Sequence, residues 1–496
     1  MNSKRILMDR KENQSDRNLL DQPLAMTTTP LDTQSRRDFL KLSAGLGAAA
    51  TLGGTKLAAQ KSAASSAVAA VAKPIAVVRV GFVGVGVKGS EHVANLLSLP
   101  GVELRAVCDP DEVACAKIVR FAEKVGKKKP TLYTRGERDF ERMCATEDLD
   151  LVYTATPWEW HVPVCLAAMR SGKHAATEIP AAITVDECWA LVETAEKTGK
   201  YCCMMENVNY MREEMAILHM VRKGLFGELV HAEGAYEHDT RYLKIRDYGD
   251  GLWLGEHHAK RNGNLYPPHG LGPIAWYLNI NRGDRLDYMV SMSSNARGMD
   301  LYAKEHLPER HPKRLKQYIN GDVNSSLLRT VNGLTIILKH DTDLPRPYSR
   351  SHLVQGTRGI VRRHPDFKVC LDRPVDDGQI WEPGADFLTK YEHPLWKQTQ
   401  EGLIQKSGRA TEVIPLVEGH ERDKPAPNGD YFEDLRLIQA LQNGVAPDFD
   451  VYDAATWSVV SALSEKSVAN RSRAVDFPDF TRGKWKTNPP VKILGV

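Results

Sequence analysis

A glycine-rich segment near residue 85 has the residue types and spacing of a phosphate-binding turn. Residues 76–83 form an apolar run typical of a buried parallel strand, and they lead directly into Gly84-Val85-Gly86-Val87-Lys88-Gly89. Gly84 would permit a tight turn, Gly86 would let backbone amides approach a pyrophosphate, and Gly89 would let the next helix pack closely. The free N–H groups at the start of that helix attract negative charge. The segment therefore predicts a dinucleotide site.

An acidic residue follows the second predicted strand, residues 103–108. This residue, Asp109, can accept hydrogen bonds from the hydroxyls of an adenosine ribose. A carboxylate at this position would repel a 2′-phosphate, so NAD(H) is favoured over NADP(H). The alternative interpretation is a glycine-rich turn that only packs.

The elements around this turn alternate between strand and helix, which predicts an α/β fold. Strands are expected at residues 150–154, 174–177 and 201–206, and helices at residues 161–170 and 184–198. This order is typical of a Rossmann domain with a doubly wound parallel sheet. Loops that follow the carboxyl ends of such strands face the ligand crevice. The loop Trp158-Glu159-Trp160-His161, Glu178 and Asn207 lie on such loops, so contact with the cofactor is expected there.

The chain changes character after residue 228, where strand patterns follow one another without long helices. Strands are expected at residues 229–236, 323–331, 334–340, 351–355 and 359–363. The pair Asn332-Gly333 is a strong signal for a β-hairpin. A second α/β domain with an open, mostly antiparallel sheet is therefore predicted. Helices at residues 432–443 and 454–470 close the chain.

Residues 77–210 resemble the Gfo/Idh/MocA family of NAD(P)-dependent sugar and polyol oxidoreductases. That family has a Rossmann domain followed by an α/β domain with an open sheet, and its members use the face of that sheet for dimerisation. Its usual strand-end motif is Glu-Lys-Pro, in which the lysine takes part in hydride chemistry. This chain has Glu178-Ile179-Pro180 instead, and an isoleucine cannot move a proton or polarise a hydroxyl.

Four further motifs resemble glycoside hydrolase family 109, an offshoot of these oxidoreductases that hydrolyses α-N-acetylgalactosaminides with bound NAD. They are Trp158-Glu159-Trp160-His161, Asn207-Val208-Asn209-Tyr210, the long run Gly263 to Pro273 and Pro345-Arg346-Pro347-Tyr348-Ser349-Arg350. The resemblance covers roughly residues 35–470. It implies NAD contacts at Val87, Lys88, Asp109, Trp158, His161, Glu178, Ile179, Asn207 and Tyr266, and sugar contacts at Tyr236, Tyr266, Pro267, Pro268, His269 and Tyr348.

The resemblance also implies a mechanism, in which NAD⁺ oxidises C3 of the sugar and a base removes the C2 proton. The aglycone then leaves C1, water adds, and the hydride returns to C3. The predicted catalytic residues are His269 and Tyr266, which lie three residues apart and share one site if a helix begins there. Histidine suits acid–base work near neutrality. Tyr266, beside a positive nicotinamide ring, is expected to have a lowered pKa.

One position departs from the family pattern. Family members usually have an arginine directly after the tryptophan that precedes the Gly263 run, whereas here Trp253 is followed by Leu254. Arg246 and Arg261 are the two candidates to supply the missing charge.

Composition excludes several classes of protein. The 496 residues carry 66 Lys and Arg against 63 Asp and Glu, and residues 60–496 carry 57 of each sign. A nucleic-acid-binding protein would have a basic footprint, so no nucleic-acid partner is predicted. No apolar run reaches the ~20 residues of a membrane span. His257 and His258 are adjacent and point apart, so no metal site is predicted. We expect a small glycoside or glycan as substrate and a homodimer as the assembly.

The N-terminal residues have the order of an export signal. Residues 35–41 include Arg36-Arg37, an uncharged stretch follows to residue 55, and Leu57-Ala58-Ala59 offers a cleavage site. The arginine pair resembles a bacterial twin-arginine signal, which predicts export to the periplasm or cell exterior. The expected organisation is a signal at 1–59, a linker at 60–75, a Rossmann domain at 76–208 and a substrate and dimerisation domain at 209–496.

Two other functions remain open at this stage. The first is an NAD-dependent sugar or polyol dehydrogenase, which the missing lysine at Ile179 disfavours. The second is a non-catalytic sugar- or nucleotide-binding protein, which the presence of Tyr266 and His269 disfavours.

The arginine pair leads to a first prediction. Replacing both residues, Arg36→Lys with Arg37→Lys, should leave the precursor in the cytoplasm because the translocase reads the arginine pair. The measurement is an immunoblot of periplasmic and cytoplasmic fractions. Export that continues in a strain without the twin-arginine translocase would contradict this prediction.

Overall fold

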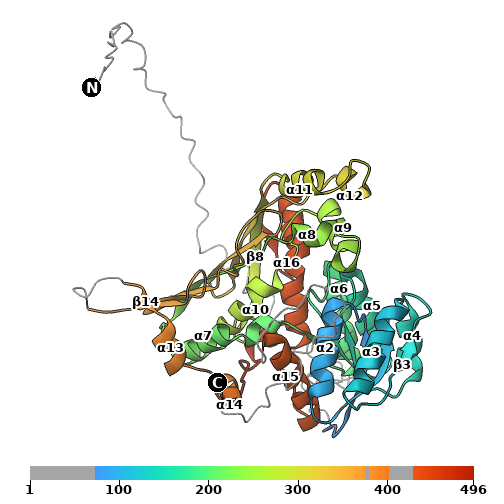
Figure 1. Ribbon diagram of the computed structural model, residues 1–496. Coiled ribbons are helices and arrows are strands. Elements are labelled where there is room, and N and C mark those ends of the chain that lie inside the picture. Colours follow the sequence, from blue (N-terminus) through green and yellow to red (C-terminus); the bar gives the residue numbers. More distant parts are fainter. Residues whose placement is uncertain (1–72, 375–379, 401–427) are drawn as a thin grey trace, which may run out of the picture. The chain divides into compact units, whose positions relative to one another are not determined.

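The computed structural model describes residues 73–374, 380–400 and 428–496. The chain divides into two units, and every described residue belongs to the second unit, Ala64–Val496. The predicted export signal at 1–59 and residues 60–72 of the predicted linker lie outside the described residues. Figure 1 shows the helices and strands of the described part, coloured along the sequence.

A six-stranded parallel sheet begins the described chain. Its strand order is β3-β2-β1-β4-β5-β6, so the direction of winding reverses between β1 and β4. This is the strand order of a doubly wound Rossmann fold, which confirms the predicted fold class. The elements are β1 (Val78–Val83), α2 (Val87–Ser98), β2 (Val102–Cys108), α3 (Glu112–Lys124), β3 (Thr131–Tyr133), α4 (Asp139–Thr146), β4 (Leu151–Thr154), α5 (Trp158–Arg170), β5 (His174–Thr177), α6 (Val185–Thr198) and β6 (Cys202–Met204).

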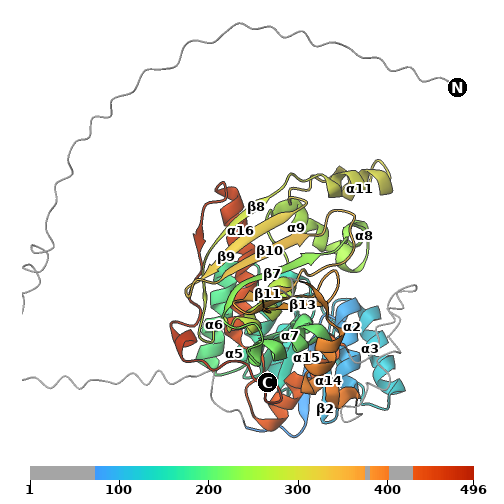
Figure 2. The same ribbon diagram turned by 90° about the vertical axis from the view of Figure 1, so that its left-hand side faces the viewer.

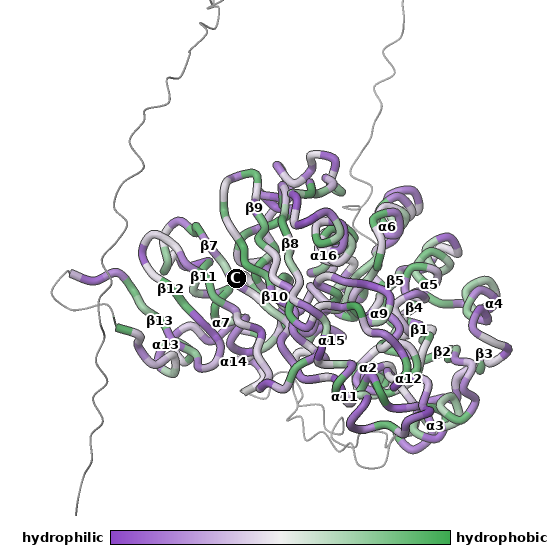
Figure 3. Tube along the Cα trace, turned by 90° about the horizontal axis from the view of Figure 1, so that it is seen from above, coloured by the Kyte–Doolittle hydropathy of each residue, from purple (hydrophilic) through white to green (hydrophobic). Residues whose placement is uncertain are grey.

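The helices around this sheet are amphipathic. Figure 3 shows that α4, α5 and α6 carry both hydrophilic and hydrophobic residues along their lengths. The strands β4, β5 and β6 are buried throughout, as expected for parallel strands covered on both faces. The apolar sides of the helices therefore pack on the sheet, and the carboxyl ends of the strands remain available for a ligand.

The glycine-rich turn between β1 and α2 has the predicted geometry. Gly84 has a φ of +82°, which a glycine adopts at low cost. A Cβ atom on Gly89 would lie 1.9 Å from the carbonyl oxygen of Gly84, so no other residue fits there without a shift. A Cβ atom on Gly86 would meet nothing within 4 Å, because this residue faces open space. The three glycines therefore serve the turn, the packing and the approach to a ligand.

The predicted loop after β4 is shorter than expected. Residues 158–161 form the first turn of α5, since Pro157 precedes the helix and its carbonyl oxygen accepts a hydrogen bond from the Trp160 amide at 3.0 Å. The sequence-based start at His161 was therefore wrong by three residues. Asn207 likewise starts a short 3₁₀ turn, η1 (Asn207–Tyr210).

A nine-stranded sheet forms the second part, in the order β14-β13-β12-β11-β7-β10-β9-β8-β15 (Figure 2). Only β7 and β10 pair in parallel, so the predicted open, mostly antiparallel sheet is confirmed. Its strands are β7 (Leu229–Glu237), β8 (Leu286–Ser293), β9 (Asn324–Thr330), β10 (Thr335–Asp341), β11 (Leu353–Gly356), β12 (Gly359–Arg362), β13 (Lys368–Leu371), β14 (Glu382–Pro383) and β15 (Val475–Asp476).

Several helices accompany this sheet. Helix α10 packs on β7 and β10, and α16 packs on β8. The helices and turns are α7 (Arg212–Arg222), α8 (Arg241–Ile245), η2 (Gly249–Leu252), α9 (Leu254–Lys260), α10 (Pro268–Tyr277), α11 (Gly298–His306), α12 (Pro312–Leu315), α13 (Ala385–Lys390), α14 (Pro394–Gln400), α15 (Gly429–Asn443), α16 (Val451–Ala469) and η4 (Lys484–Lys486).

The sheet is covered by these helices on one face. Residues of β9 alternate strictly between buried and more exposed positions, and Leu327 is 48% exposed. Such alternation is typical of an antiparallel sheet with one free face. The use of this face for dimerisation stays a prediction.

The sequence did not predict β8. A register shift between Leu286 and Tyr288 interrupts its alternation of apolar and polar residues. This shift removes the period-two signal on which recognition of a strand depends.

The last two long helices return to the parallel sheet. Helix α15 packs against α2 and η1, and α16 packs against α6 and β6 (Figures 1 and 2). The C-terminal segment therefore takes part in both halves, and the predicted boundary at residue 208 stays a prediction. Among the described residues, no helix combines the length and the apolar character needed to cross a membrane.

The glycine turn leads to a second prediction. Gly89→Ala should lower the free energy of unfolding by about 1–3 kcal/mol, the usual effect of inserting a methyl group into filled space. Thermal unfolding of the protein without added nucleotide measures this effect. The matched control is Gly86→Ala, whose new methyl group meets open space and should leave stability nearly unchanged. Equal melting temperatures for the two variants would contradict the packing role of Gly89.

Candidate active site

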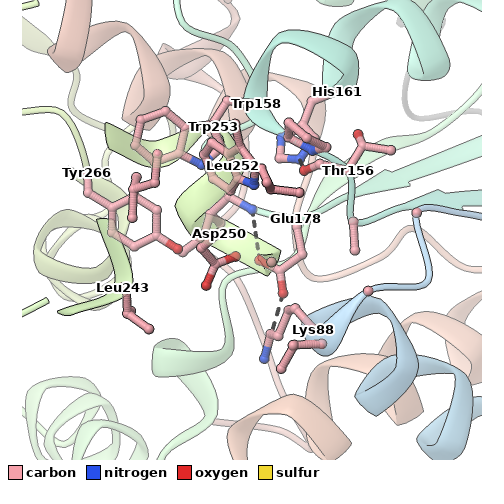
Figure 4. A pocket seen from close by; sticks show the side chains of 18 of the residues that line it. Lys88, Thr156, Trp158, His161, Glu178, Leu243, Asp250, Leu252, Trp253 and Tyr266 are labelled. Carbon is pink, nitrogen blue, oxygen red and sulfur yellow. Dashed lines mark hydrogen bonds and ion pairs between the residues drawn. The ribbon is translucent and has the colours of Figure 1, made fainter. Parts of the chain in front are cut away.

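A cavity of about 900 Å³ runs along the carboxyl ends of the parallel strands to the second sheet. Figure 4 shows Glu178 pointing toward Lys88, with the rings of Trp158, Trp253 and Tyr266 gathered on another side. Most of the predicted site residues line the cavity: Gly84, Gly86, Val87, Lys88, Asp109, Trp158, Glu159, Trp160, His161, Glu178, Ile179, Asn207, Tyr236, Tyr266, His269 and Tyr348. Gly89, Pro267 and Pro268 do not line it, because Gly89 packs under the turn and both prolines start α10.

The glycine turn and the start of α2 form one end of the cavity. No side chain caps this helix start, and its first turn contains no acidic residue. The backbone N–H groups there are therefore available to an anion. Asp109 holds the turn, because its carboxylate accepts hydrogen bonds from the backbone amides of Val85 and Asp111, both at 2.8 Å. Burial raises the pKa of Asp109.

A network of charged side chains joins α2, the end of β5 and α15. His92 contacts Glu178 Oε1 through Nε2 at 2.8 Å and Asp434 Oδ2 through Nδ1 at 2.9 Å. Burial would lower the pKa of His92, but Asp434 and Glu178 outweigh it and raise the pKa to about 10. Burial would raise the pKa of Glu178, but Lys88 and His92 outweigh it and lower the pKa to about 2. His92 is therefore an imidazolium at neutral pH, and Glu178 is ionised.

Lys88 extends this network to the cavity. Its ammonium group pairs with Asp430 of α15 and lies 3.7 Å from Glu178 Oε1. Burial acts to lower the pKa of Lys88, but Asp430 and Glu178 raise it well above its usual value. A positive charge therefore faces the same end of the cavity as the free N–H groups of α2.

Three buried side chains lie close enough together for their ligand atoms to surround a metal ion. The possible ligand atoms of His92, Glu178 and Glu433 lie within 4.8 Å of one another. The His92 imidazolium donates through both nitrogens and has no lone pair to offer. Burial and neighbouring carboxylates raise the pKa of Glu433 well above its usual value, which disfavours the carboxylate form that a metal ion requires. We interpret the cluster as an ion-pair network.

His161 ties two strand-end loops together. Its Nδ1 lies 2.7 Å from the carbonyl oxygen of Pro180, and its Nε2 lies 2.9 Å from that of Thr156. Burial lowers the pKa of His161, and the two carbonyl oxygens act in the opposite direction. Its ring therefore fixes the loops after β4 and β5 at the wall of the cavity.

Aromatic rings connect the two ends of the cavity. Tyr266 stacks on Trp158, with ring centroids 5.7 Å apart, and lies 4.8 Å from the Tyr236 ring. Tyr348 meets Tyr236 edge-on at 6.4 Å. Burial raises the pKa of Tyr266 well above its usual value. The surroundings that the protein supplies therefore shift this pKa in the direction opposite to the sequence-based expectation, which assigned a lowering to a positive nicotinamide ring.

A histidine–carboxylate pair lies beside these rings. Helix α10 begins at Pro268, so Tyr266 and His269 share one site as expected, with ring centroids 5.1 Å apart. His269 Nδ1 lies 2.8 Å from Glu206 Oε1, and Glu206 is fully buried. The carboxylate fixes the tautomer with hydrogen on Nδ1, so Nε2 keeps its lone pair. The pair therefore has the arrangement of an oriented general base.

Sequence reasoning missed Glu206 as a functional residue, although a signal existed. Glu206 follows β6 in the same way that Glu178 follows β5, so both carboxylates lie at the carboxyl edge of the sheet. It also missed Arg350, which lines the cavity from the segment after Tyr348. Nothing in the local pattern distinguishes Arg350 from the nearby Arg346, which pairs with Glu237 and Asp341 at the surface of the sheet.

A buried ion-pair cluster supports the far wall of the cavity and was also missed. Lys244 of α8 donates to Thr342 Oγ1 at 2.9 Å and pairs with Asp343. His258 of α9 contacts the same carboxylate at 2.9 Å, whereas His257 points toward Glu159, 3.6 Å away. The two adjacent histidines therefore point apart, as expected from the sequence.

Arg246 and Arg261, the two candidates to replace the arginine that family members have at residue 254, lie in different parts of the structure. Arg246 lines the cavity together with Leu254. Arg261 pairs with Glu465 of α16 and donates to Ser461 Oγ at 2.9 Å, and it is absent from the cavity wall. Only Arg246 is therefore placed to supply a charge near Leu254.

Family models match almost the whole described chain. "Glycosyl hydrolase 109, C-terminal domain" matches residues 210–487, and "Oxidoreductase family, NAD-binding Rossmann fold" matches residues 78–206. A model of the twin-arginine translocation pathway signal sequence matches residues 33–53, which confirms the predicted export signal.

Curated relatives match most of the chain. A "Glycosyl hydrolase family 109 protein" of Shewanella pealeana is 46% identical over 473 residues, which cover 93% of this chain and 99% of the relative. A protein of Shewanella oneidensis named "Alpha-N-acetylgalactosaminidase" is 44% identical over 477 residues, with the same coverage.

Solved structures share the fold. A levoglucosan dehydrogenase in complex with NADH and levoglucosan has a TM-score of 0.56 at 16% identity, covering 81% of this chain and all of that one. An NAD binding oxidoreductase from Klebsiella pneumoniae has a TM-score of 0.59 at 16% identity, with 82% and 100% coverage. At this identity the likeness establishes the architecture alone.

The His92 network leads to a third prediction, on the pH dependence of stability. The pKa of His92 is about 10 in the folded chain and about 6.5 unfolded, so its stabilisation is complete below pH 6.5. It is lost as the pH rises through 10. The difference in unfolding free energy between wild type and His92→Gln should therefore shrink from pH 6.5 to pH 10, as measured by denaturant titration.

The control is His306→Gln, because His306 is exposed and distant from the network. This variant should follow the wild-type curve across the same range. A difference for His92→Gln that stays constant from pH 6.5 to pH 10 would contradict the assigned imidazolium.

Proposed function

The chain belongs to glycosyl hydrolase family 109, and we propose that it hydrolyses terminal α-N-acetylgalactosaminides or related glycosides after export. The proposed mechanism is transient oxidation at C3 with bound NAD, followed by elimination of the aglycone. One observation carries the proposal. A single cavity connects the glycine turn at Gly86 with the His269–Glu206 pair, and Tyr266 stacks between the two ends.

The residues at the turn fit a dinucleotide. The start of α2 and Lys88 offer positive charge to a pyrophosphate, and Gly86 leaves room for its approach. Asp109 and Asp111 also line the cavity, and their carboxylates would repel a 2′-phosphate. We therefore infer NAD(H) as the cofactor, which when bound accepts a hydride from C3 and later returns it.

The proton chemistry is assigned to the other end of the cavity. His269 Nε2 takes the C2 proton, and Glu206 stabilises the imidazolium that results. Burial keeps the phenol of Tyr266 protonated, so its hydroxyl donates to the substrate. The rings of Tyr236 and Tyr348 offer flat apolar surfaces with hydroxyls at their edges, as sugar-binding sites do.

Ile179 argues against a simple dehydrogenase. It is 3% exposed, lines the cavity and follows Glu178, where dehydrogenases of the fold family have their lysine. An isoleucine cannot deprotonate a hydroxyl, so this residue cannot act as the lysine does in those dehydrogenases. In the proposed cycle the hydride returns to C3 and is not released as NADH.

The proposal leads to a fourth prediction. Hydrolysis of an α-N-acetylgalactosaminide that carries deuterium at C2 should give a product that has lost the label to solvent, as measured by mass spectrometry. His269→Ala should lower kcat by ~10²–10⁴, the usual contribution of a positioned acid or base. Denaturing the purified enzyme should release NAD.

Two outcomes would overturn parts of this proposal. Full retention of deuterium at high conversion excludes elimination. Accumulation of NADH in step with consumption of a free sugar, without hydrolysis, would favour the dehydrogenase. A matched control is His257→Ala, because His257 is near Trp158 but has no contact with Glu206. This variant should keep most of its activity.

A further inference from the structure

Arg350 is a buried cation at the sugar end of the cavity. The residue is 6% exposed and lines the cavity together with Tyr348 and His269. Its guanidinium lies 4.9 Å from the Tyr348 ring centre, and Nη1 lies 2.9 Å from the sulfur of Met211. Its buried Nε has no hydrogen-bond partner among the described residues. None of these neighbours carries a negative charge.

The nearby carboxylates have other, closer partners. Glu206 pairs with His269, and Glu214 lies 3.2 Å from Arg363 Nε and 3.1 Å from His352 Nδ1. Burial acts to lower the pKa of Arg350, but Tyr348 and these two carboxylates act on it at longer range and raise its pKa. A buried charge without a close counterion is unfavourable, because its lost hydration is not replaced. The arrangement therefore calls for a negatively charged group from a ligand.

Other buried cations of the described chain show the contrast. Lys244 pairs with Asp343, and Arg282 lies 2.6 Å from Asp453 through two separate nitrogen–oxygen contacts. Both of these pairs hold helices in place, and both are complete within the chain. Arg350 lacks such a partner, and it is the one of the three beside the predicted sugar contacts Tyr236 and Tyr348.

The proposed reaction creates a negative charge in this place. When the C2–H bond breaks, the proton goes to His269 and the electron pair forms a C2=C3 double bond. The π pair of the C3 carbonyl moves onto O3, which becomes an enolate oxygen. A lone pair of O3 then re-forms the C3 carbonyl, the C2=C3 π pair moves to form C1=C2, and the C1–O bond breaks. The aglycone leaves with the C1–O bond pair and takes up a proton from solvent.

We propose that Arg350 is a catalytic residue that stabilises the enolate oxygen O3 through its guanidinium. This inference rests on the proposed function and adds the electrostatic partner that the elimination requires. A fixed buried cation aimed at a developing oxyanion stabilises the transition state more than the neutral ground state. Arg350 should therefore affect removal of the C2 proton strongly and binding of a neutral sugar weakly.

The test compares two readouts in the NAD-containing protein. Calorimetry measures binding of N-acetylgalactosamine, and mass spectrometry measures loss of C2 deuterium from the labelled glycoside. Arg350→Gln should slow label loss by ~10²–10³, the usual effect of removing one oxyanion-stabilising group. Binding of N-acetylgalactosamine should change less than threefold. Arg350→Lys keeps the charge, so it should lose the label at least tenfold faster than Arg350→Gln.

Controls separate this role from a structural one. Arg346→Gln changes a nearby arginine that pairs with Glu237 and Asp341 and does not line the cavity, and it should leave label loss near the wild-type rate. Thermal unfolding checks that each variant is folded. If Arg350→Gln is not folded, Arg350→Lys is compared with the wild-type enzyme instead.

The outcomes distinguish this inference from the proposed function. If the rate of deuterium loss in Arg350→Gln is within threefold of the wild-type rate, the role of Arg350 is overturned and the proposed function is not. A loss of sugar binding as large as the loss of rate also overturns it, because Arg350 would then be a binding residue. No label loss in the wild-type enzyme overturns the elimination mechanism itself, and the role of Arg350 fails with it.

Discussion

The imidazolium of His92, held between Glu178 and Asp434, is the interaction on which the arrangement of the cavity depends. It joins the helix after the glycine turn, the end of β5 and helix α15, which are distant in the sequence. Because both ring nitrogens meet carboxylates, the ring cannot turn without losing a charged partner. The carboxylate of Glu178 is thereby directed toward Lys88 at the cofactor end, and α15 is fixed against the Rossmann sheet.

The two neighbouring strand ends use the same pair of residue types for different purposes. At the end of β5, Glu178 meets a histidine that has a second carboxylate partner, so that histidine stays charged and structural. At the end of β6, Glu206 meets His269 through Nδ1 alone, and among the described residues Nε2 has no carboxylate partner. Within 2.9 Å, His92 therefore has two carboxylate partners, whereas His269 has one.

Local patterns in the sequence were sufficient to predict the glycine turn, the acidic end of β2 and most strands, because each depends on residues close in the chain. The start of α5 at Trp158 and the irregular β8 were not predicted, because a proline and a register shift changed the local signal. Glu206 and Arg350 could be recognised as site residues only from the three-dimensional structure. The partner of Glu206 is His269, which lies 63 residues away in the sequence. Arg350 stands out because the neighbours of its guanidinium, Tyr348 and Met211, carry no negative charge.

Ile179 bears on why the two ends of the cavity have different roles. With an isoleucine where related dehydrogenases have their lysine, residue 179 itself offers no group that can move a proton. The candidate groups for proton transfer, Tyr266 and His269, lie together at the start of α10 on the opposite wall, near the cation of Arg350. In the proposed reaction, the proton removed on that side comes from the carbon adjacent to the oxidised centre rather than from the hydroxyl that a lysine would serve. The proposed elimination differs from the dehydrogenase reaction in this respect, because its base acts one carbon away from the hydride.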